Sequence, residues 1–226
     1  MVGKDKEHLL KIFSDLNNED TSDPKNKWKK TLEIKEKDGL ACLVQQRPVP
    51  GRNVNMFKNA TIFRGISIGA WLEFSINFME YMKDDPQFSK NKPADIVEQD
   101  ADKKHTIYHN LTPMGALASL REILVQSDFI QLEEKKYLLV ARSIEMDQFP
   151  KKDDVVRIEY FRCQTVEEKD GDLHTLGFSN IDFGGYFPSS LMNMIISGMI
   201  SGGKKNSYNM YKKIQGMIEK GELTPP

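Results

Sequence analysis

The chain has 226 residues, and its 32 Lys and Arg side chains nearly balance its 33 Asp and Glu side chains, which leaves a net charge of −1 with neutral histidines. This balance argues against a general nucleic-acid binder and against a polybasic segment held on anionic lipid by charge alone. The chain start lacks a signal-peptide core, no apolar run approaches the ~20 residues of a spanning helix, and Cys42 and Cys163 are too few for a disulfide framework. We therefore expect a soluble protein of the cytoplasm.

The first half of the chain predicts a helix, three strands and a second helix. Apolar residues at helical spacing predict the first helix over residues 8–16, and the polar stretch 17–27 predicts a loop. Three strand-like runs come next, over residues 28–36, 40–47 and 56–64. Residues 68–82 again place apolar side chains at helical spacing, which predicts an amphipathic helix. The polar stretch 84–93 predicts a loop or a short helix.

The second half of the chain predicts strands followed by one long helix. Short apolar runs rich in β-branched and aromatic residues cover residues 106–108, 123–125, 137–140, 155–161 and 176–183. Because no helical pattern separates these runs, they predict five or six strands in an antiparallel meander. Pro188 opens a long C-terminal helix, which Ser201-Gly202-Gly203 should kink or split.

This order of elements predicts one α+β domain. Residues 1–27 form its N-terminal helix and loop, and residues 28–226 form a strongly curved antiparallel sheet wrapped around the long C-terminal helix. Such a sheet encloses more volume than its side chains readily fill, and an empty void costs about 24 cal/mol per Å³. The domain is therefore either collapsed onto a filled core or built to hold an apolar molecule, such as a lipid chain. Topology alone leaves both alternatives open.

Three segments resemble a known family. Residues 105–121 resemble the strand, loop and Arg-Asp turn of the START family, the StAR-related lipid-transfer domains. Residues 141–144 and 155–159 are similar to the next strands of that family. Residues 180–188, with the sequence NIDFGGYFP, are similar to the Asp-x-x-Gly-aromatic-x-Pro motif that leads into its C-terminal helix. The three motifs occur in the family's order, and the resemblance covers residues 28 to about 217, nearly the whole chain.

The resemblance implies a helix-grip fold with a lipid-sized tunnel under the C-terminal helix, no catalysis and no cofactor. It implies a gate formed by that helix and the loop 112–119, with Met114, Leu117 and Leu191 as gate residues. The lipid-binding residues that it implies are His109, Asn110, Arg121, Ile123, Ser127, Phe161, Cys163, Met192, Ile195, Ile196 and Met199.

The chain departs from the phosphatidylcholine pattern of the family. Members that transfer this lipid contact its phosphate through an Arg near the third helix, but the stretch 84–93 contains no Arg. The aromatic positions that surround choline fall on His109, Ile123 and Phe161, and only Phe161 keeps the aromatic character.

The sterol pattern is also altered. The Glu and Arg that form a polar pair in sterol-carrying members are replaced by Asn110 and Ser127, and the Arg-Asp turn becomes Arg121-Glu122. Asn110, Ser127 and Cys163 suggest a neutral or weakly polar head-group pocket. We expect a phospholipid cargo in preference to a sterol or a ceramide.

Gly65-Ile66-Ser67-Ile68-Gly69 matches the nucleophile elbow Gly-x-Ser-x-Gly, which gives a hydrolase as an alternative function. That fold needs a parallel sheet and a downstream triad, for which His174 with Asp147 or Asp182 are the candidates. The predicted meander does not suit it, because parallel strands need crossover connections. The other interpretation is that Ser67 caps the helix that follows.

No metal site is expected. The histidines do not have the spacing of a metal motif: they are His8, His105, His109 and His174. His105 and His109, four apart in a strand, point to one face. The acidic cluster Glu98, Asp100 and Asp102 lacks the Gly and the terminal Glu of a calcium loop, and it predicts a solvated turn.

The C-terminal helix carries several methionines, which adapt to varied apolar partners and suit a lid over a lipid. Residues 191–200 are apolar around most of the helix, which suits either membrane contact during loading or a dimer contact. We expect a monomer that meets membranes transiently, with Lys204 and Lys205 near head-group phosphates, and that transfers one lipid between them. The alternatives are a lipid-sensing regulatory binder that does not shuttle and a hydrolase that uses Ser67.

Overall fold

The structure, a computed structural model, describes residues 2–17, 27–49, 54–82, 94–112, 120–185 and 189–223. Its helices are α1 (Val2–Asn17), α2 (Ile68–Ile76), α3 (Phe78–Met82) and α4 (Ser189–Glu219). The first strands are β1 (Lys29–Lys37), β2 (Leu40–Arg47), β3 (Met56–Phe63), β4 (Asp95–Gln99) and β5 (His105–Thr112). The remaining strands are β6 (Leu120–Glu133), β7 (Lys136–Ser143), β8 (Val155–Arg157), β9 (Glu159–Lys169) and β10 (Asp172–Asp182).

All ten strands belong to one sheet, in the order β1-β2-β3-β10-β9-β7-β6-β5-β4, with β8 paired to β6 alone. Neighbours along this path are antiparallel, and the β6–β8 pair is parallel. The predicted meander is therefore confirmed from β4 to β10, with β8 as an insertion. The first three strands join the sheet where β3 pairs with β10.

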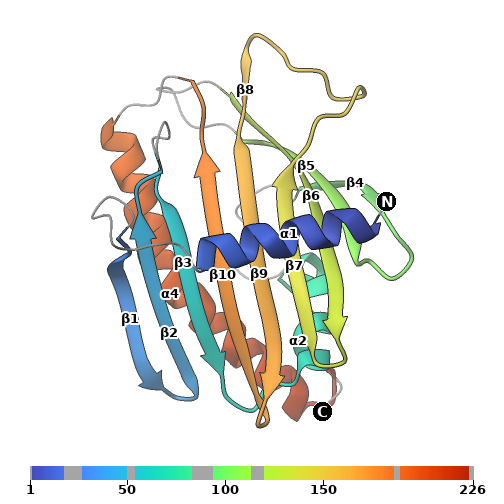
Figure 1. Ribbon diagram of the computed structural model, residues 1–226, viewed down its shortest axis with the longest axis vertical. Coiled ribbons are helices and arrows are strands. Elements are labelled where there is room, and N and C mark those ends of the chain that lie inside the picture. The colour runs from blue at the N-terminus through green and yellow to red at the C-terminus, as the bar shows by residue number, and fades with distance from the viewer. Residues whose placement is uncertain are drawn as a thin grey trace.

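Helix α1 covers one face of the sheet, which we call the outer face (Figure 1). Its Leu9 is buried in a cluster with residues of β7 and β9, namely Leu138, Val140 and Cys163. Near the end of α1, the ring of Phe13 packs edge-on against Phe178 of β10, with the ring centroids 5.3 Å apart. This contact places the even-numbered side chains of β10 on the outer face.

Helices α2 and α4 cover the opposite face, which we call the inner face (Figure 1). One end of this face forms the α2 cluster, whose buried members include Trp71, Phe74, Leu139, Val166, Leu173, Tyr211 and Ile214. The other end forms the Met192 cluster, which consists of Val54, Ile158, Phe183 and Met192, with Ile123 and Ile196 packed against it. A long C-terminal helix thus lies across one face of a large antiparallel sheet, and the predicted helix-grip fold is confirmed.

The outcomes of the helix predictions differ. The helix predicted over 68–82 is interrupted at Asn77, whose backbone N–H and side-chain amide both donate to the carbonyl of Glu73, and α3 follows from Phe78 to Met82. The C-terminal helix is one element through residues 201–203, so the predicted split is wrong, and the alternative of a kink there stays a prediction. The helix predicted over residues 8–16 is confirmed, but α1 begins six residues earlier, at Val2.

The described residues after α3 form seven strands, where five or six were predicted. β4 was not predicted because it is a short, mostly polar strand at the edge of the sheet; Glu98 lies within it, and Asp100 and Asp102 follow in the turn before β5. The predicted run 155–161 is divided at Ile158, whose backbone N–H donates to the carbonyl of Glu122. Of the loop predicted over 17–27, residues 18–26 lie outside the described residues, and so does the whole stretch 84–93, which was predicted as a loop or a short helix.

Candidate functional site

The sheet register separates the expected lipid-binding residues between its two faces. Asn110 pairs with Ile123, and Ile123 packs on the Met192 cluster, so both lie on the inner face with Met192 and Ile196. Ser127, four residues further along β6, shares this face.

Three expected residues lie on the outer face instead. Cys163 is in the cluster with Leu9 of α1, and Phe161 packs against the same cluster. His109 pairs with Leu124, which alternates with Ile123 and therefore points to the outer face with His105. These three residues do not face α4, so they do not line a site beneath that helix.

For the remaining expected residues, either the whole residue or its side chain lies outside the described part of the structure. Met114 and Leu117 of the expected gate lie outside the described residues. Leu191, Ile195 and Met199 belong to α4, but their side chains are outside the described set.

Arg121 is fully buried on the inner face and holds the turn that leads into α4. Its Nε donates to the carbonyl of Phe183 at 2.9 Å, and its Nη2 donates to the carbonyl of Gly184 at 3.2 Å. Burial lowers the pKa of the guanidinium, because the charged form loses hydration. These contacts give Arg121 a structural part in fixing the start of α4.

Glu122 points the other way, into a polar network on the outer face. Its Oε2 accepts from Arg157 Nε at 2.8 Å and from Arg157 Nη2 at 2.6 Å, and its Oε1 lies 3.0 Å from His109 Nε2. The His109 ring stacks on Phe149 at a centroid distance of 4.4 Å. His109 is therefore fixed by the network around β6 and β8.

A row of polar side chains crosses the inner face between the two apolar clusters. We call this row the polar belt; it consists of Cys42, Asn59, Thr61, Ser127, Arg162, Gln164, Thr175 and Ser179. Four of its members are at least nine-tenths buried: Cys42, Thr61, Gln164 and Thr175. Buried polar groups of this kind need hydrogen-bond partners.

Some members of the polar belt form hydrogen bonds with one another. Thr61 Oγ1 donates to Asn59 Oδ1 at 2.9 Å, and Cys42 Sγ donates to the same oxygen at 3.4 Å. Burial raises the pKa of Cys42, which keeps the thiol protonated and able to donate. On the central strand, Arg162 Nη2 donates to the side-chain oxygen of Gln164.

The sequence interpretation missed most of this belt, although alternation contained the signal. On β9, Arg162 and Gln164 alternate with Phe161 and Cys163. Of these four residues, Phe161 and Cys163 were the two predicted to bind the lipid. The position of α1 determines which side of β9 faces α4. Because α1 packs on the apolar side of β9, the polar side of that strand faces α4. Nothing in the strand pattern itself identifies which face a second helix covers.

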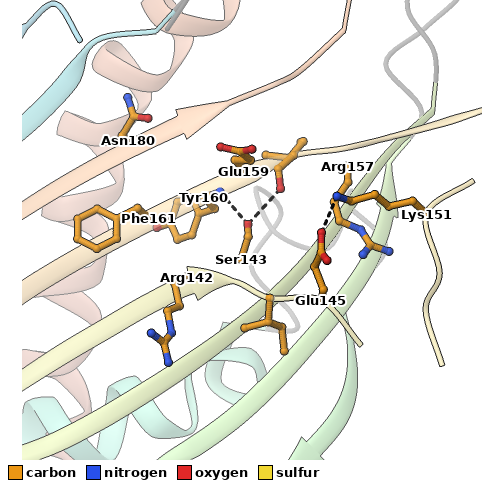
Figure 2. A pocket seen from close by; sticks show the side chains of 11 residues that line it. Arg142, Ser143, Glu145, Lys151, Arg157, Glu159, Tyr160, Phe161 and Asn180 are labelled. Atoms are coloured by element: carbon orange, nitrogen blue, oxygen red, sulfur yellow. Dashed lines mark hydrogen bonds and ion pairs between the residues drawn. The ribbon is translucent and has the colours of Figure 1, made fainter. Parts of the chain in front are cut away.

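An open pocket of about 360 Å³ lies where β7 ends and β9 begins (Figure 2). Its wall includes Arg142 and Phe161, which pair with each other on the outer face. The hydroxyl of Ser143 accepts from the N–H of Tyr160 at 2.8 Å and donates to the carbonyl of Ile158 at 3.1 Å (Figure 2). These bonds fix the start of β9, and the outer-face wall distinguishes this pocket from a site beneath α4.

Ser67 caps α2, as the second interpretation of its motif predicted. Its Oγ accepts from the N–H of Ala70 at 3.1 Å, and the side chain is buried. The N–H of Ile68 donates to Glu168 Oε2 at 2.9 Å. The antiparallel sheet also differs from the parallel sheet that a nucleophile elbow requires.

Two further expectations concern metals and membranes. Across the described ranges, no group of three or more His, Cys, Asp and Glu side chains is placed to hold a metal ion. His105 Nδ1 instead lies 2.6 Å from Asp128 Oδ1. None of the described helices has the length and apolar character to cross a membrane.

Comparison with known proteins gives one family. The START domain model matches residues 24–212. The solved structure of human STARD10 has a TM-score of 0.61, with 13% sequence identity over 94% of this chain and 80% of that one. Human StAR-related lipid transfer protein 5 has a TM-score of 0.60, with 17% identity over 95% of this chain and 96% of that one.

A fragment of a STAR-related lipid transfer protein from Xanthomonas axonopodis has a TM-score of 0.58, with 14% identity over 83% of this chain and 98% of that one. No curated protein matches the chain at a significant level of sequence similarity. The structural likenesses show a shared fold, and the family model covers well over half of the chain. The chain therefore belongs to the START domain family.

Proposed function

We propose that the protein binds one lipid between the inner face of its sheet and α4 and carries it from one membrane to another. The observation that carries this proposal is the polar belt, half of whose members are buried, between two apolar clusters beneath a single long helix. An amphipathic molecule suits that order, because its head group needs hydrogen-bond partners and its chains gain about 0.8 kcal/mol for each methylene group removed from water. Family membership supports the proposal, as do two structural neighbours whose names describe lipid transfer.

We propose that the N-terminal half of α4 opens to admit the lipid. The C-terminal half is fixed by directional bonds, since Tyr211 donates from its hydroxyl to the carbonyl of Arg64 at 3.0 Å. In the N-terminal half, Met192 and Ile196 make apolar contacts with the Met192 cluster. Apolar contacts are not directional, so this half separates from the sheet at lower cost. The loop 112–119, with Met114 and Leu117, and Leu191 complete the proposed gate.

We further propose a phospholipid cargo and a monomer that works in the cytoplasm with transient membrane contact. The small net charge supports brief visits to a membrane, because no strong electrostatic attraction retains the protein there. Both cysteines are free thiols, which is consistent with a reducing compartment.

Introducing negatively charged side chains into the Met192 cluster tests the transfer proposal. In a vesicle-to-vesicle assay with labelled phosphatidylcholine, we expect the double variant Met192→Asp, Ile196→Asp to lose at least about tenfold of the transfer rate, since buried carboxylates disrupt the Met192 cluster. Ile96→Asp is the matched control, because Ile96 is 53% exposed on the edge strand β4. Unchanged transfer by a folded double variant contradicts the gate.

Native mass spectrometry of the purified wild-type protein tests the function itself. A bound lipid supports the proposal, and a protein that takes up no lipid from vesicles contradicts it. Lipid binding without transfer indicates instead a sensor that holds its ligand.

A further inference from the structure

Arg162 places a positive charge in the middle of the inner face. It lies on β9, the central strand of the sheet, opposite Ala141 of β7 and Ser179 of β10. The Arg162 side chain is half-buried, and its only partner among the described residues is the side-chain oxygen of Gln164. That partner is neutral, so it brings no counter-charge to the guanidinium.

The described surroundings of Arg162 provide no free carboxylate. On β7, β9 and β10, the only acidic side chain at an inner-face position is Glu168, at the far end of β9. Its oxygens already accept from Lys135 Nζ at 2.5 Å and from the N–H of Ile68 at 2.9 Å. The sequence of α4 contains no Asp or Glu before Glu219. A partly buried cation without a counter-charge is costly, and a ligand that brings a negative group removes that cost.

Gln164 makes the arrangement rigid and adds a donor. The side chain is nine-tenths buried, and its oxygen orients the guanidinium of Arg162. Among the described residues, no hydrogen bond engages its amide nitrogen. Gly177 makes room for this side chain, because a Cβ at that position would lie 3.1 Å from Cβ and 3.2 Å from Cγ of Gln164. Two donors on one strand thus face the space beneath α4.

We propose that Arg162 and Gln164 together bind an anionic oxygen group of the lipid, a phosphate or a carboxylate. The Arg fork and the amide N–H group donate to that group, and the apolar part of the lipid extends toward Ile123, Met192 and Ile196. This inference rests on the proposed function and deepens it, because it excludes sterols and neutral acylglycerols as the preferred cargo.

Binding from mixed vesicles tests the lipid class on the unmodified protein. Vesicles that contain equal amounts of phosphatidylcholine, oleic acid, diacylglycerol and cholesterol are incubated with the protein, and the bound lipid is identified by native mass spectrometry. We expect the bound lipid to be phosphatidylcholine or oleic acid. Phosphatidylcholine would show that the site takes a phosphate, and oleic acid would show that it takes a carboxylate. Preferential uptake of diacylglycerol or cholesterol overturns the inference while leaving lipid binding intact, whereas no uptake at all overturns the proposed function.

The variant Arg162→Met tests the residue itself. We expect affinity for the phosphatidylcholine or oleic acid found above to fall roughly tenfold or more, because a charge-assisted hydrogen bond to its phosphate or carboxylate is lost. Arg162→Lys should retain part of the affinity, and affinity for diacylglycerol should not fall. Arg142→Met is the matched control, since Arg142 lies on the neighbouring strand but on the outer face (Figure 2).

The variants also separate the inference from a folding defect. If Arg162→Met binds the phosphatidylcholine or oleic acid as tightly as the wild type does, the inference is overturned. If Arg162→Met does not fold, Arg162→Lys takes its place. The inference is then overturned if Arg162→Lys has unchanged affinity and the wild type prefers a neutral lipid.

Discussion

At the scale of single residues, the dipeptide Arg121-Glu122 places two buried charges on opposite faces of the sheet. Arg121 is held by backbone carbonyls at the turn before α4, and Glu122 is held by Arg157 and His109. Each charged side chain is hydrogen-bonded where it lies, so β6 is tied to β8 on one side and to the turn before α4 on the other. The pair therefore positions the gate helix without contacting a ligand in the described structure.

Glu122 gives a pH-dependent prediction. Burial raises the pKa of Glu122, but the hydrogen bonds from Arg157 and His109 outweigh it and hold the pKa below its usual value of 4.5. The ionised carboxylate therefore stabilises the fold above this value, and the stabilisation is lost as the pH falls through the lower folded-state pKa. We expect Glu122→Gln to cost about 3 kcal/mol at pH 7, because Arg157 loses its counter-charge.

Thermal unfolding from pH 7 to pH 3 measures this effect. The Tm of the wild type should fall more steeply below pH 4.5 than that of Glu122→Gln. Glu145→Gln is the control, because the Glu145–Lys151 pair is largely exposed and worth little. Parallel Tm curves for the wild type and Glu122→Gln would contradict the assignment.

At the scale of elements, the turn between β10 and α4 depends on two glycines in the left-handed region. Gly184 has φ of +59° and Gly185 has φ of +57°. A Cβ at Gly184 would also lie 2.9 Å from Val156 Cγ1 of β8. The turn therefore combines a backbone shape that favours glycine with a close approach of two elements.

The variant Gly184→Ala should destabilise the protein by roughly 2 kcal/mol or more, because backbone strain adds to the clash with Val156. Gly171→Ala is the control for strain alone, since Gly171 has φ of +81° and open space around its Cβ position. In denaturant unfolding, we expect Gly184→Ala to have a lower free energy of unfolding than Gly171→Ala. Equal losses for the two variants would show that the contact with Val156 adds nothing.

Apolar patterning predicted most elements, and its failures have identifiable causes. The runs at 28–36 and 40–47 were located within a residue or two, because alternation in paired strands is regular. β4 was missed because an edge strand needs few apolar residues. The assignment of Cys163 and Phe161 to the ligand was not predictable in the same way, since long-range packing of α1 determines which side of β9 is covered.

At the scale of the whole molecule, the sheet separates two layers with different chemistry. The outer layer is a small apolar core under α1, and the inner layer combines apolar clusters with the polar belt under α4 (Figure 1). A change in one layer should therefore leave the other largely unaffected, because the sheet backbone lies between them. This independence can be tested from the side of α1.

Leu9→Ala should loosen α1 without affecting lipid binding. Leu9 is 6% exposed, and truncating a buried Leu costs roughly 2–5 kcal/mol. Burial raises the pKa of Cys163 to about 12, so its thiol should resist alkylation at neutral pH in the wild type. In Leu9→Ala we expect a lower Tm and faster alkylation of Cys163, located by mass spectrometry, with an unchanged preference among lipids. A shift in that preference would show instead that α1 and the inner face act as one unit.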